Sequence, residues 1–530
     1  MLEYRSTAVF HLNSKYPLIK TRKKEVIFMR LSKKIISALI SVVLILSVAI
    51  PAFAAVDENA VCPLIYVPGV DASKIYADKN DPDSVMQLVD KDKLIAMLQN
   101  DIAPALVVYS ADRDIDALAH KVTGALNEIY GCWFNNPDGT AQGNGGAVMK
   151  YPAASSVKKN SEFTFSYDWR GDPMTAASEL KAFIDYVTEN SGCEKVALAG
   201  HSLGNIVILS YLSLYGDSDV MGIVFDTSTI DGVEYIGELL CGEMEINGDS
   251  VTAFLKSVLG ENGYKDLIKS SLDIFDMAGI PEMLAVFLDD ILKKIGPTIF
   301  KETLIPMFAY WPSVWAMTTD AQLDEAMDYI FGVVHKDEDM SALTAKLEAY
   351  NETVRKNKKA TLTAFDENGR VAVISRYGFS YLPITGNSKL ISDTVVETKT
   401  SSFGATTADA GDYFSDEYLK GKDMKYISPD KTVDASTAMF AGKTWFIKNI
   451  FHNESEETRV LHKTLLFAAE EADRDNSDLP GFMYYNRDTG EFVADETAPE
   501  KVKKTTPLEK LFNFLKALID KIVDFFTKKK

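Results

Sequence analysis

The segment Gly200-His201-Ser202-Leu203-Gly204 constrains the fold of this chain more than any other stretch. It follows an apolar run, Lys195–Ala199, and opens a second one, Leu203–Tyr215. The glycines on either side of the serine leave room for a turn that larger side chains would block. The segment therefore predicts a strand, a tight turn that carries Ser202, and a helix whose N–H groups point at that turn.

Other segments alternate in the same way. An apolar run that ends in Pro-Gly opens the series, and further strands and helices follow it. Such alternation implies a mostly parallel sheet with helices on both faces, which is an α/β fold. The predicted strands are Pro63–Gly69, Phe163–Tyr167, Lys195–Ala199, Gly222–Asp226, Val371–Ser375 and Thr444–Ile447, and the predicted helices are residues 84–130, Thr175–Glu189, Leu203–Tyr215 and Ser455–Glu470.

Changes of pattern divide the chain into six parts. From about Val233 to Asn357 helical spacing dominates and strand signals vanish, which indicates a helical cap inserted into the α/β unit. A polar stretch near the C-terminus is typical of a linker. The expected parts are an N-terminal extension with a signal peptide (1–54), the first part of the core (55–232), the cap (233–357), the second part of the core (358–471), the linker (472–506) and an amphipathic C-terminal helix (507–530).

The N-terminus has the pattern of a secretory signal. The basic stretch Arg30–Lys34 precedes an apolar run, Ile36–Ile50, and a small-x-small motif, Ala52–Ala54. The apolar run is shorter than the roughly 20 residues that span a bilayer, which favours cleavage over anchoring. We expect Met29 to be the start, cleavage between Ala54 and Ala55, and a protein that is secreted or associated with the cell envelope.

Composition excludes several classes of protein. The hydrophobic share is 46% and the charged share 25%, which is typical of a globular chain with a real core and not of a disordered one. The net charge of −20 argues against nucleic acid as a partner, because such binding depends on clustered Lys and Arg. Four cysteines in 530 residues do not form a disulfide framework. The sequence leaves the oligomeric state open.

A serine nucleophile needs a base, and the base needs a carboxylate that orients it. In proteins whose serine lies on a strand–turn–helix of this kind, the acid follows the serine in the chain and the base follows the acid. Among the six histidines, His452 follows a predicted strand and precedes the final helix, where a loop turns back toward Ser202. We expect His452 to be the base. The other histidines precede the serine, adjoin it, or lie in the cap or inside a helix: His11, His120, His201, His335 and His462.

The acid is sought between the nucleophile and the base. Asp393 follows the strand at Val371–Ser375 and begins the stretch Asp393-Thr394-Val395-Val396. Its two valines would fix this loop on the core while the carboxylate faces His452. We expect Asp393 to be the acid, with Asp366, Asp409 and Asp412 as the alternatives.

An oxyanion hole needs two backbone N–H donors. The residue after the nucleophile, Leu203, supplies one, and the loop Val67-Pro68-Gly69-Val70 supplies the other through the N–H of Val70. We expect neither a cofactor nor a metal. The spacing Asp112, Asp114, Asp116 is similar to the start of a calcium loop, but the chain lacks the glycine and glutamate that this loop requires.

Four segments together resemble the lecithin:cholesterol acyltransferase-like branch of the α/β-hydrolases, which includes lysosomal phospholipase A2 and phospholipid:diacylglycerol acyltransferases. They are the opening strand and loop (Pro63–Gly69), the Tyr167-Asp168-Trp169-Arg170 motif, the elbow Gly200–Asn205 and the acid loop Asp393–Val396. The resemblance implies an α/β-hydrolase fold and a Ser202–Asp393–His452 triad that forms an acyl-enzyme on glycerolipid or related esters.

The resemblance also raises three structural questions. Thr394 stands where the family's acid loop has glycine. Some members hold a lid with a disulfide near the oxyanion loop, and Cys62 and Cys132 would be the corresponding pair. Trp169 would either line the acyl pocket or pin the loop beside it, and both interpretations stay open.

The cap and the tail suggest contact with lipid. The cap is rich in large apolar residues, which suits either a lid over long acyl chains or packing on the core below. Residues 507–530 combine a broad apolar face with lysines opposite it, as expected of a helix that lies on a bilayer, docks on a partner or packs on its own domain.

Two functions from different classes remain. The first is an exported serine esterase or lipase-type acyl hydrolase, or an O-acyltransferase, acting on lipid esters. The second is a non-catalytic protein that binds lipid or the cell surface on a hydrolase scaffold.

Overall fold

A computed structural model describes most of the chain. The described residues all belong to one compact unit, Ala52–Lys530. The predicted signal peptide and the predicted C-terminal helix lie outside them. The described residues are 61–86, short stretches between 93 and 109, 114–243, 292–382, 389–467, 473–474 and 479–497. Among these residues no helix has the length and apolar character needed to cross a membrane.

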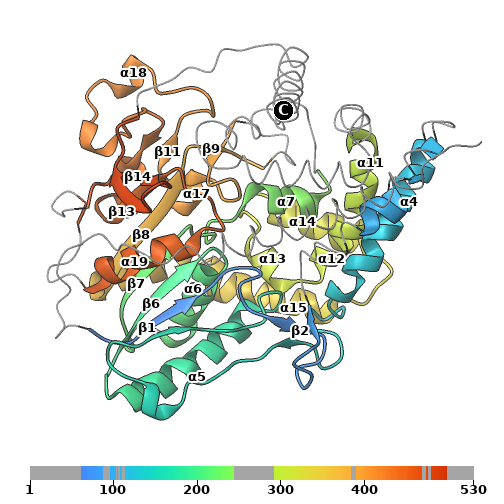
Figure 1. Cartoon of the computed structure of the whole chain (residues 1–530), viewed down its shortest axis with the longest axis horizontal. Helices are drawn as coiled ribbons and strands as arrows, with labels where there is room; N and C mark the ends of the chain where they lie inside the picture. Colours follow the sequence, from blue (N-terminus) through green and yellow to red (C-terminus); the bar gives the residue numbers. More distant parts are fainter. Residues whose placement is uncertain are drawn as a thin grey trace, which may run out of the picture. The chain divides into compact units, whose positions relative to one another are not determined.

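An eight-stranded sheet forms the centre of this unit, in the order β15-β14-β13-β8-β7-β6-β1-β5 (Figure 1). All neighbouring strands run parallel except β14 and β15, which form an antiparallel hairpin at one edge. The predicted α/β fold is therefore confirmed. The strands are β1 (Leu64–Val67), β5 (Glu162–Thr164), β6 (Val196–His201), β7 (Val220–Asp226), β8 (Arg370–Tyr377), β13 (Thr444–Lys448), β14 (Phe482–Asn486) and β15 (Glu491–Ala494).

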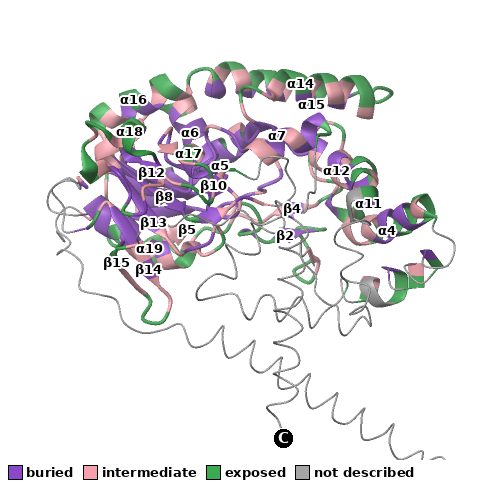
Figure 2. Ribbon diagram, turned by 90° about the horizontal axis from the view of Figure 1, so that it is seen from above, coloured by how far each residue is buried: buried purple, intermediate pink, exposed green. Residues whose placement is uncertain are grey.

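Helices cover both faces of the sheet. Successive strand residues point to opposite sides, and the apolar residues on each side pack against a layer of helices. On one face, Ile65, Leu198 and Ile223 join the core cluster that includes α5 (Pro173–Ser191) and α6 (Gly204–Tyr215). On the other face, Leu64 and Ala197 belong to the cluster under α19 (Ser455–Phe467). Figure 2 shows the central strands of this sheet in the colour of buried residues. Because helices cover both faces, the side chains of the central strands are apolar on both faces.

Helix ends follow the local sequence. Asp172 caps α5 by accepting from the N–H groups of Met174 and Thr175, and Pro173 occupies its first turn. Asp114 caps α4 (Ile115–Tyr130) in the same way, accepting from Ala117 N at 3.0 Å. Asp114 is one of the three aspartates with calcium-like spacing, and its role in the structure is to cap this helix.

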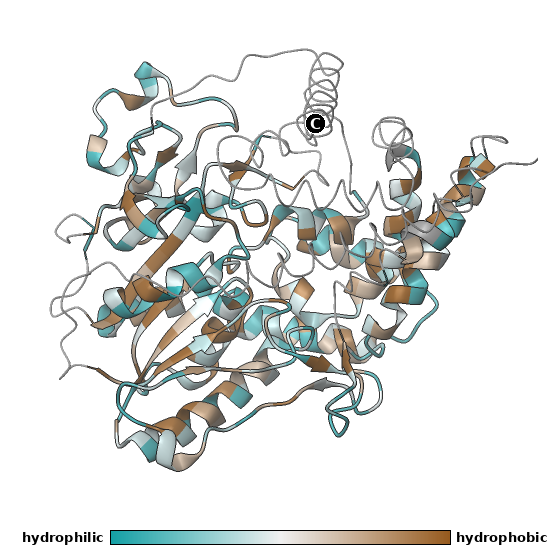
Figure 3. Ribbon diagram, in the orientation of Figure 1, coloured by the Kyte–Doolittle hydropathy of each residue, from teal (hydrophilic) through white to brown (hydrophobic). Residues whose placement is uncertain are grey.

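The described residues between 233 and 357 contain helices and no strand. Figure 1 shows these helices gathered beside the sheet, and in Figure 3 apolar and polar residues alternate along them. Trp311, Trp315 and Met307 are buried among them. The helices are α7 (Glu234–Cys241), α11 (Leu292–Ile299), α12 (Ile305–Ala309), α13 (Pro312–Ala316), α14 (Leu323–Tyr329) and α15 (Ser341–Tyr350); α16 (Lys358–Asn368) then leads back to the sheet.

Two stretches differ from the sequence-based expectation. The predicted linker 472–506 contains the hairpin β14–β15, because Phe482 and Met483 pack into the core while Gly490, at φ +72°, closes the turn. The predicted helix 84–130 begins with a strand, β3. The remaining short elements are β2 (Ile75–Tyr76), β3 (Val85–Met86), β4 (Gly146–Ala147), β9 (Phe379–Ser380), β10 (Ile391–Ser392), β11 (Thr406–Thr407), β12 (Val433–Asp434), α17 (Thr398–Ser401) and α18 (Asp416–Leu419).

The cysteine pair suggested by the family resemblance does not form. All four cysteines are free. Cys62 is buried in the core cluster under α19, whereas Cys132 is exposed after α4. The side chain that packs near Cys62 is Cys193, and burial together with this neighbour raises the pKa of the Cys62 thiol to about 12.

Candidate active site

Ser202 lies at the carboxyl end of β6, on the turn that leads into α6. Its φ of +53° is in the left-handed region, which a non-glycine residue rarely adopts and which is typical of a strained nucleophile turn. A side chain at Gly204 would overlap the carbonyl of Val67, and one at Gly200 would overlap Asn205. The two glycines are therefore required by the close approach of neighbouring backbone and side chains.

His452 reaches this serine from the loop between β13 and α19. Its Nε2 lies 3.0 Å from Ser202 Oγ. The ring is only 13% exposed, and the ring of His201 packs against it at a centroid distance of 4.9 Å. A hydrogen bond of this length allows the imidazole to take the hydroxyl proton directly.

Asp393 lies behind the histidine, after β10. Its Oδ2 is 2.7 Å from His452 Nδ1, and its Oδ1 accepts from the N–H groups of Val395 and Val396 at 2.9 and 2.7 Å. Burial opposes ionisation of this carboxyl, but the charge and hydrogen bond of His452 and the N–H of Val396 outweigh it. The pKa of Asp393 is therefore lowered from its ordinary value.

The three side chains form a chain of hydrogen bonds with one direction. An ionised Asp393 accepts a hydrogen bond from Nδ1–H of His452, and this tautomer leaves Nε2 as the acceptor for the Ser202 hydroxyl. Ser202 and His452 follow the carboxyl ends of the parallel strands β6 and β13, where open α/β sheets place their ligand sites, and Asp393 follows β10 of the small antiparallel pair β9–β10. The arrangement has the geometry of a base-activated nucleophile.

The predicted oxyanion donors flank the serine. Leu203 is the N-cap residue of α6 and directly follows Ser202. Gly69 packs so closely that a Cβ at this position would lie 2.8 Å from Ser202 Cβ and 3.3 Å from its Oγ. Val70 follows this glycine and is 38% exposed beside the site. The predicted loop and the helix start therefore meet at Ser202.

The Tyr167–Arg170 motif fixes the Gly69 loop. Tyr167 donates through its hydroxyl to Pro68 O at 2.7 Å, and Trp169 donates through Nε1 to Ser73 O at 3.0 Å. Trp169 has no exposed surface and stacks on Trp133. Of the two roles left open for Trp169, lining the substrate pocket and pinning the loop, the structure shows contacts of the second kind, because other aromatic residues enclose the ring. Its contacts are those of a residue that pins a loop.

Residues 148–248 match the family model of lecithin:cholesterol acyltransferase. This segment of the chain is therefore similar to lecithin:cholesterol acyltransferase, and the sheet around it has an α/β architecture. The matched segment includes the Tyr167–Arg170 motif and Ser202, whereas Asp393 and His452 lie beyond it.

A solved structure titled "The crystal structure of Tle4-Tli4 complex" is also similar, at 16% identity and a TM-score of 0.20. The similarity covers 35% of this chain and 48% of that chain, so this chain spans about half of its length. A search of curated proteins found no match.

The alternative acids and bases have other partners. Asp366 pairs with Lys443 at 2.9 Å, and Asp409 pairs with Lys389 at 3.1 Å. Asp412 accepts from the N–H of Tyr413. The remaining described histidines also contact carboxylates or the backbone: His120 with Glu302, His335 with Glu338, His462 with Asp226, and His201 with His452 O.

Sequence reasoning missed two charged residues next to the triad. Asp226 ends β7 and Arg376 lies near the end of β8, and both side chains are fully buried. The signal for Arg376 is a charged residue that directly continues an apolar strand. Charged side chains are almost never fully buried unless they are paired, so this position marks an internal partner.

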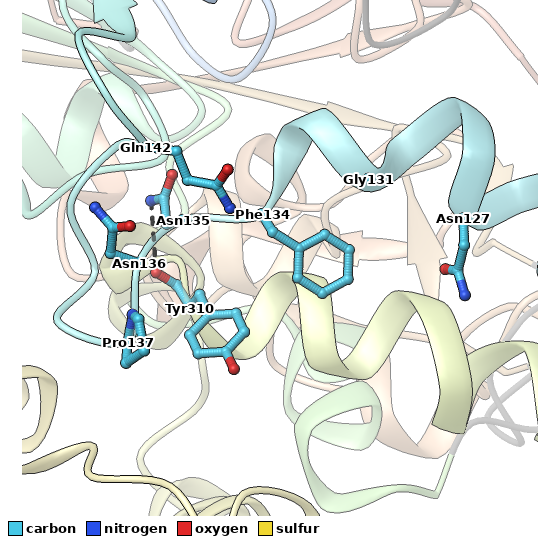
Figure 4. Close-up of a pocket in the computed structure, with 8 residues that line it drawn as sticks. All are labelled: Asn127, Gly131, Phe134, Asn135, Asn136, Pro137, Gln142 and Tyr310. Atoms are coloured by element: carbon cyan, nitrogen blue, oxygen red, sulfur yellow. Dashed lines mark hydrogen bonds between the residues drawn. The ribbon is translucent and has the colours of Figure 1, made fainter.

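A hollow of about 490 Å³ lies elsewhere, between the end of α4 and Tyr310 at the end of α12 (Figure 4). The triad does not line it. Figure 4 shows the amide side chains of Asn135, Asn136 and Gln142 near the rings of Phe134 and Tyr310. Within the described residues no cluster of three or more His, Cys, Asp or Glu side chains has the geometry of a metal site.

Proposed function

We propose that this chain is an exported serine ester hydrolase or O-acyltransferase that acts on lipid esters through an acyl-enzyme. One observation carries the proposal, namely the relay from Asp393 Oδ2 through His452 to Ser202 Oγ, with distances of 2.7 and 3.0 Å. The match to the lecithin:cholesterol acyltransferase family supports lipase- or acyltransferase-type chemistry.

The first half of the reaction forms the acyl-enzyme. His452 accepts the hydroxyl proton as Ser202 Oγ attacks the ester carbonyl carbon, and the carbonyl oxygen becomes an oxyanion. The N–H groups of Leu203 and Val70 donate to this oxyanion, each contributing about 3–4 kcal/mol of barrier lowering. The C–O bond to the alcohol then breaks, and His452 returns its proton to the departing alkoxide oxygen. The products are an acyl-Ser202 ester and a free alcohol.

The second half releases the acyl group. His452 takes a proton from water or from an acceptor alcohol, whose oxygen attacks the acyl carbon. Collapse of the second tetrahedral intermediate returns the proton to Ser202 Oγ. Water gives a free acid, and an alcohol gives a new ester. A lipid panel with and without added alcohols, analysed by mass spectrometry, separates hydrolysis from transfer.

Export and surface contact are further parts of this proposal. The pattern of residues 1–54 supports cleavage after Ala54, and Edman sequencing of the protein from the medium or envelope would test it. The apolar and lysine-rich faces of residues 507–530 support contact with a bilayer. A variant that lacks 507–530 should lose binding to anionic vesicles but keep turnover of a soluble ester.

The central test uses a fluorophosphonate probe, which labels only an activated serine. The native protein should be labelled and should hydrolyse p-nitrophenyl esters, and Ser202→Ala should do neither. Ser210→Ala is a matched control, because Ser210 is buried like Ser202 but lies inside α6 and donates to Ile206 O. Native protein that remains unlabelled, or a Ser202→Ala protein with undiminished turnover, overturns the proposal and favours a non-catalytic lipid-binding role.

A further inference from the structure

A buried ion pair lies directly behind the triad. Nη2 of Arg376 is 3.3 Å from both carboxylate oxygens of Asp226, and both side chains are 0% exposed. Burying two charges costs free energy that their attraction repays only when the remaining donors and acceptors are also satisfied. The other contacts of the pair therefore decide what it contributes to the protein.

The arginine holds the backbone of the triad histidine. Its Nη1 donates to His452 O at 3.0 Å and to the carbonyl of Phe451. His201 donates through Nε2 to the same His452 O, also at 3.0 Å. His452 N donates to Asp393 O at 3.0 Å. Both polar groups of the His452 backbone are thus fixed by named partners.

The aspartate holds the nucleophile turn. Its backbone carbonyl accepts from Ser202 N at 3.1 Å and from Asn205 Nδ2 at 2.9 Å. Its carboxylate accepts from His462 Nε2 at 3.1 Å. Asp226 therefore connects to the serine turn through its backbone and to the histidine loop through Arg376.

The protonation states favour this arrangement. Burial lowers the pKa of His201 to about 3, and the nearby charges of His452 and Arg376 act in the same direction. A neutral His201 donates from Nε2 at any pH near neutrality. Burial alone would raise the pKa of Asp226, but Arg376 and the hydrogen bond from His462 outweigh it and lower the pKa.

We propose that Arg376, held by Asp226, is a positioning residue that fixes the backbone of His452 so that Nε2 stays within reach of Ser202 Oγ. The inference rests on the proposed function. His452 lies in a loop outside the sheet, and its side chain must hold the productive geometry to within roughly 0.5 Å. Two donors on its carbonyl and one acceptor on its N–H supply that restraint.

The test compares two variants of Arg376 with a matched control in the full chain. Arg376→Met should lower kcat and the rate of fluorophosphonate labelling about 100-fold, with KM for a p-nitrophenyl ester changed less than about twofold. Arg376→Lys restores one donor and should recover about tenfold. Arg355→Met removes another buried arginine that donates to backbone carbonyls, of Thr318 and Trp315. It should lower Tm but leave kcat unchanged.

The outcomes separate this inference from the proposed function. Native protein that the probe does not label overturns both. Native protein that is labelled, with Arg376→Met labelled at the same rate, overturns this inference alone. If Arg376→Met does not fold, Arg376→Lys and His201→Leu decide: each should lower kcat about tenfold without changing KM, and native kcat in both contradicts the inference.

Discussion

Asp393 contacts His452 at two points, through its carboxylate at Nδ1 (2.7 Å) and through its backbone carbonyl at the histidine N–H (3.0 Å). The side-chain contact sets the tautomer of the imidazole, and the backbone contact sets the position of the loop. The two contacts respond to different substitutions, because only the first depends on the identity of the side chain.

Asp393→Asn should therefore lower kcat by about 10⁴-fold with little change in Tm, because an amide no longer holds the proton on Nδ1. The backbone contact and the acceptor for Val395 and Val396 persist in this variant. Esterase kinetics and thermal unfolding measure the two effects. Asp366→Asn is the matched control and should keep native activity. Native kcat in Asp393→Asn together with a large loss of kcat in Asp366→Asn would identify Asp366 as the acid instead.

Thr394 carries strain that glycine would relieve. Its φ of +87° is an outlier for a β-branched residue. Thr394→Gly should raise the free energy of unfolding by about 1 kcal/mol, because relief of the strain exceeds the added entropy of the unfolded chain. Urea denaturation measures this change. Thr363→Gly, in helix α16, should destabilise instead, and a loss of stability at both positions would contradict the explanation.

Gly69→Ala should impair catalysis more than folding. The added Cβ would lie 2.8 Å from Ser202 Cβ and would displace the loop that carries the Val70 N–H. We expect kcat to fall about 100-fold with a small change in Tm. In α4, a Cβ at Gly124 meets nothing within 4 Å. Gly124→Ala should keep native kcat and gain up to about 1 kcal/mol of stability. Equal kcat in the two variants would refute the predicted role of the loop.

The buried carboxyl of Glu397 should make stability depend on pH. Burial raises its pKa to about 7, although Tyr381 and the N–H of Glu234 donate to it. The folded state therefore binds more protons than the unfolded state between about pH 4.5 and pH 7, and the free energy of unfolding falls as pH rises through this window, by up to about 3 kcal/mol.

Glu397→Gln tests this dependence. Urea denaturation at about pH 5 and about pH 8 should show that the native protein loses more stability than the variant on going to the higher pH. Glu417→Gln, at an exposed position on α18, is the control and should follow the native curve. A Glu397→Gln protein that loses as much stability as the native protein would rule out this carboxyl as the source.

The sequence predicted much of the fold because local patterns specify it. The apolar run before Ser202 predicts β6, and the glycines around the serine predict the turn. It failed at β14–β15, where a short hairpin inside a polar stretch gains its stability by packing on the edge of the existing sheet. It also left the role of Trp169 open, because a strand-end tryptophan has the same local pattern whether it faces substrate or other rings.

The sequence by itself determined the α/β alternation, the nucleophile turn and a short set of candidate acids and bases, since these follow from periodicity, glycine sterics and chain order. Only the tertiary structure brought Ser202, Asp393 and His452 into contact and placed Arg376 behind them. These contacts join residues as far as 250 positions apart, and the packing of parallel strands, not any local preference, sets their distances.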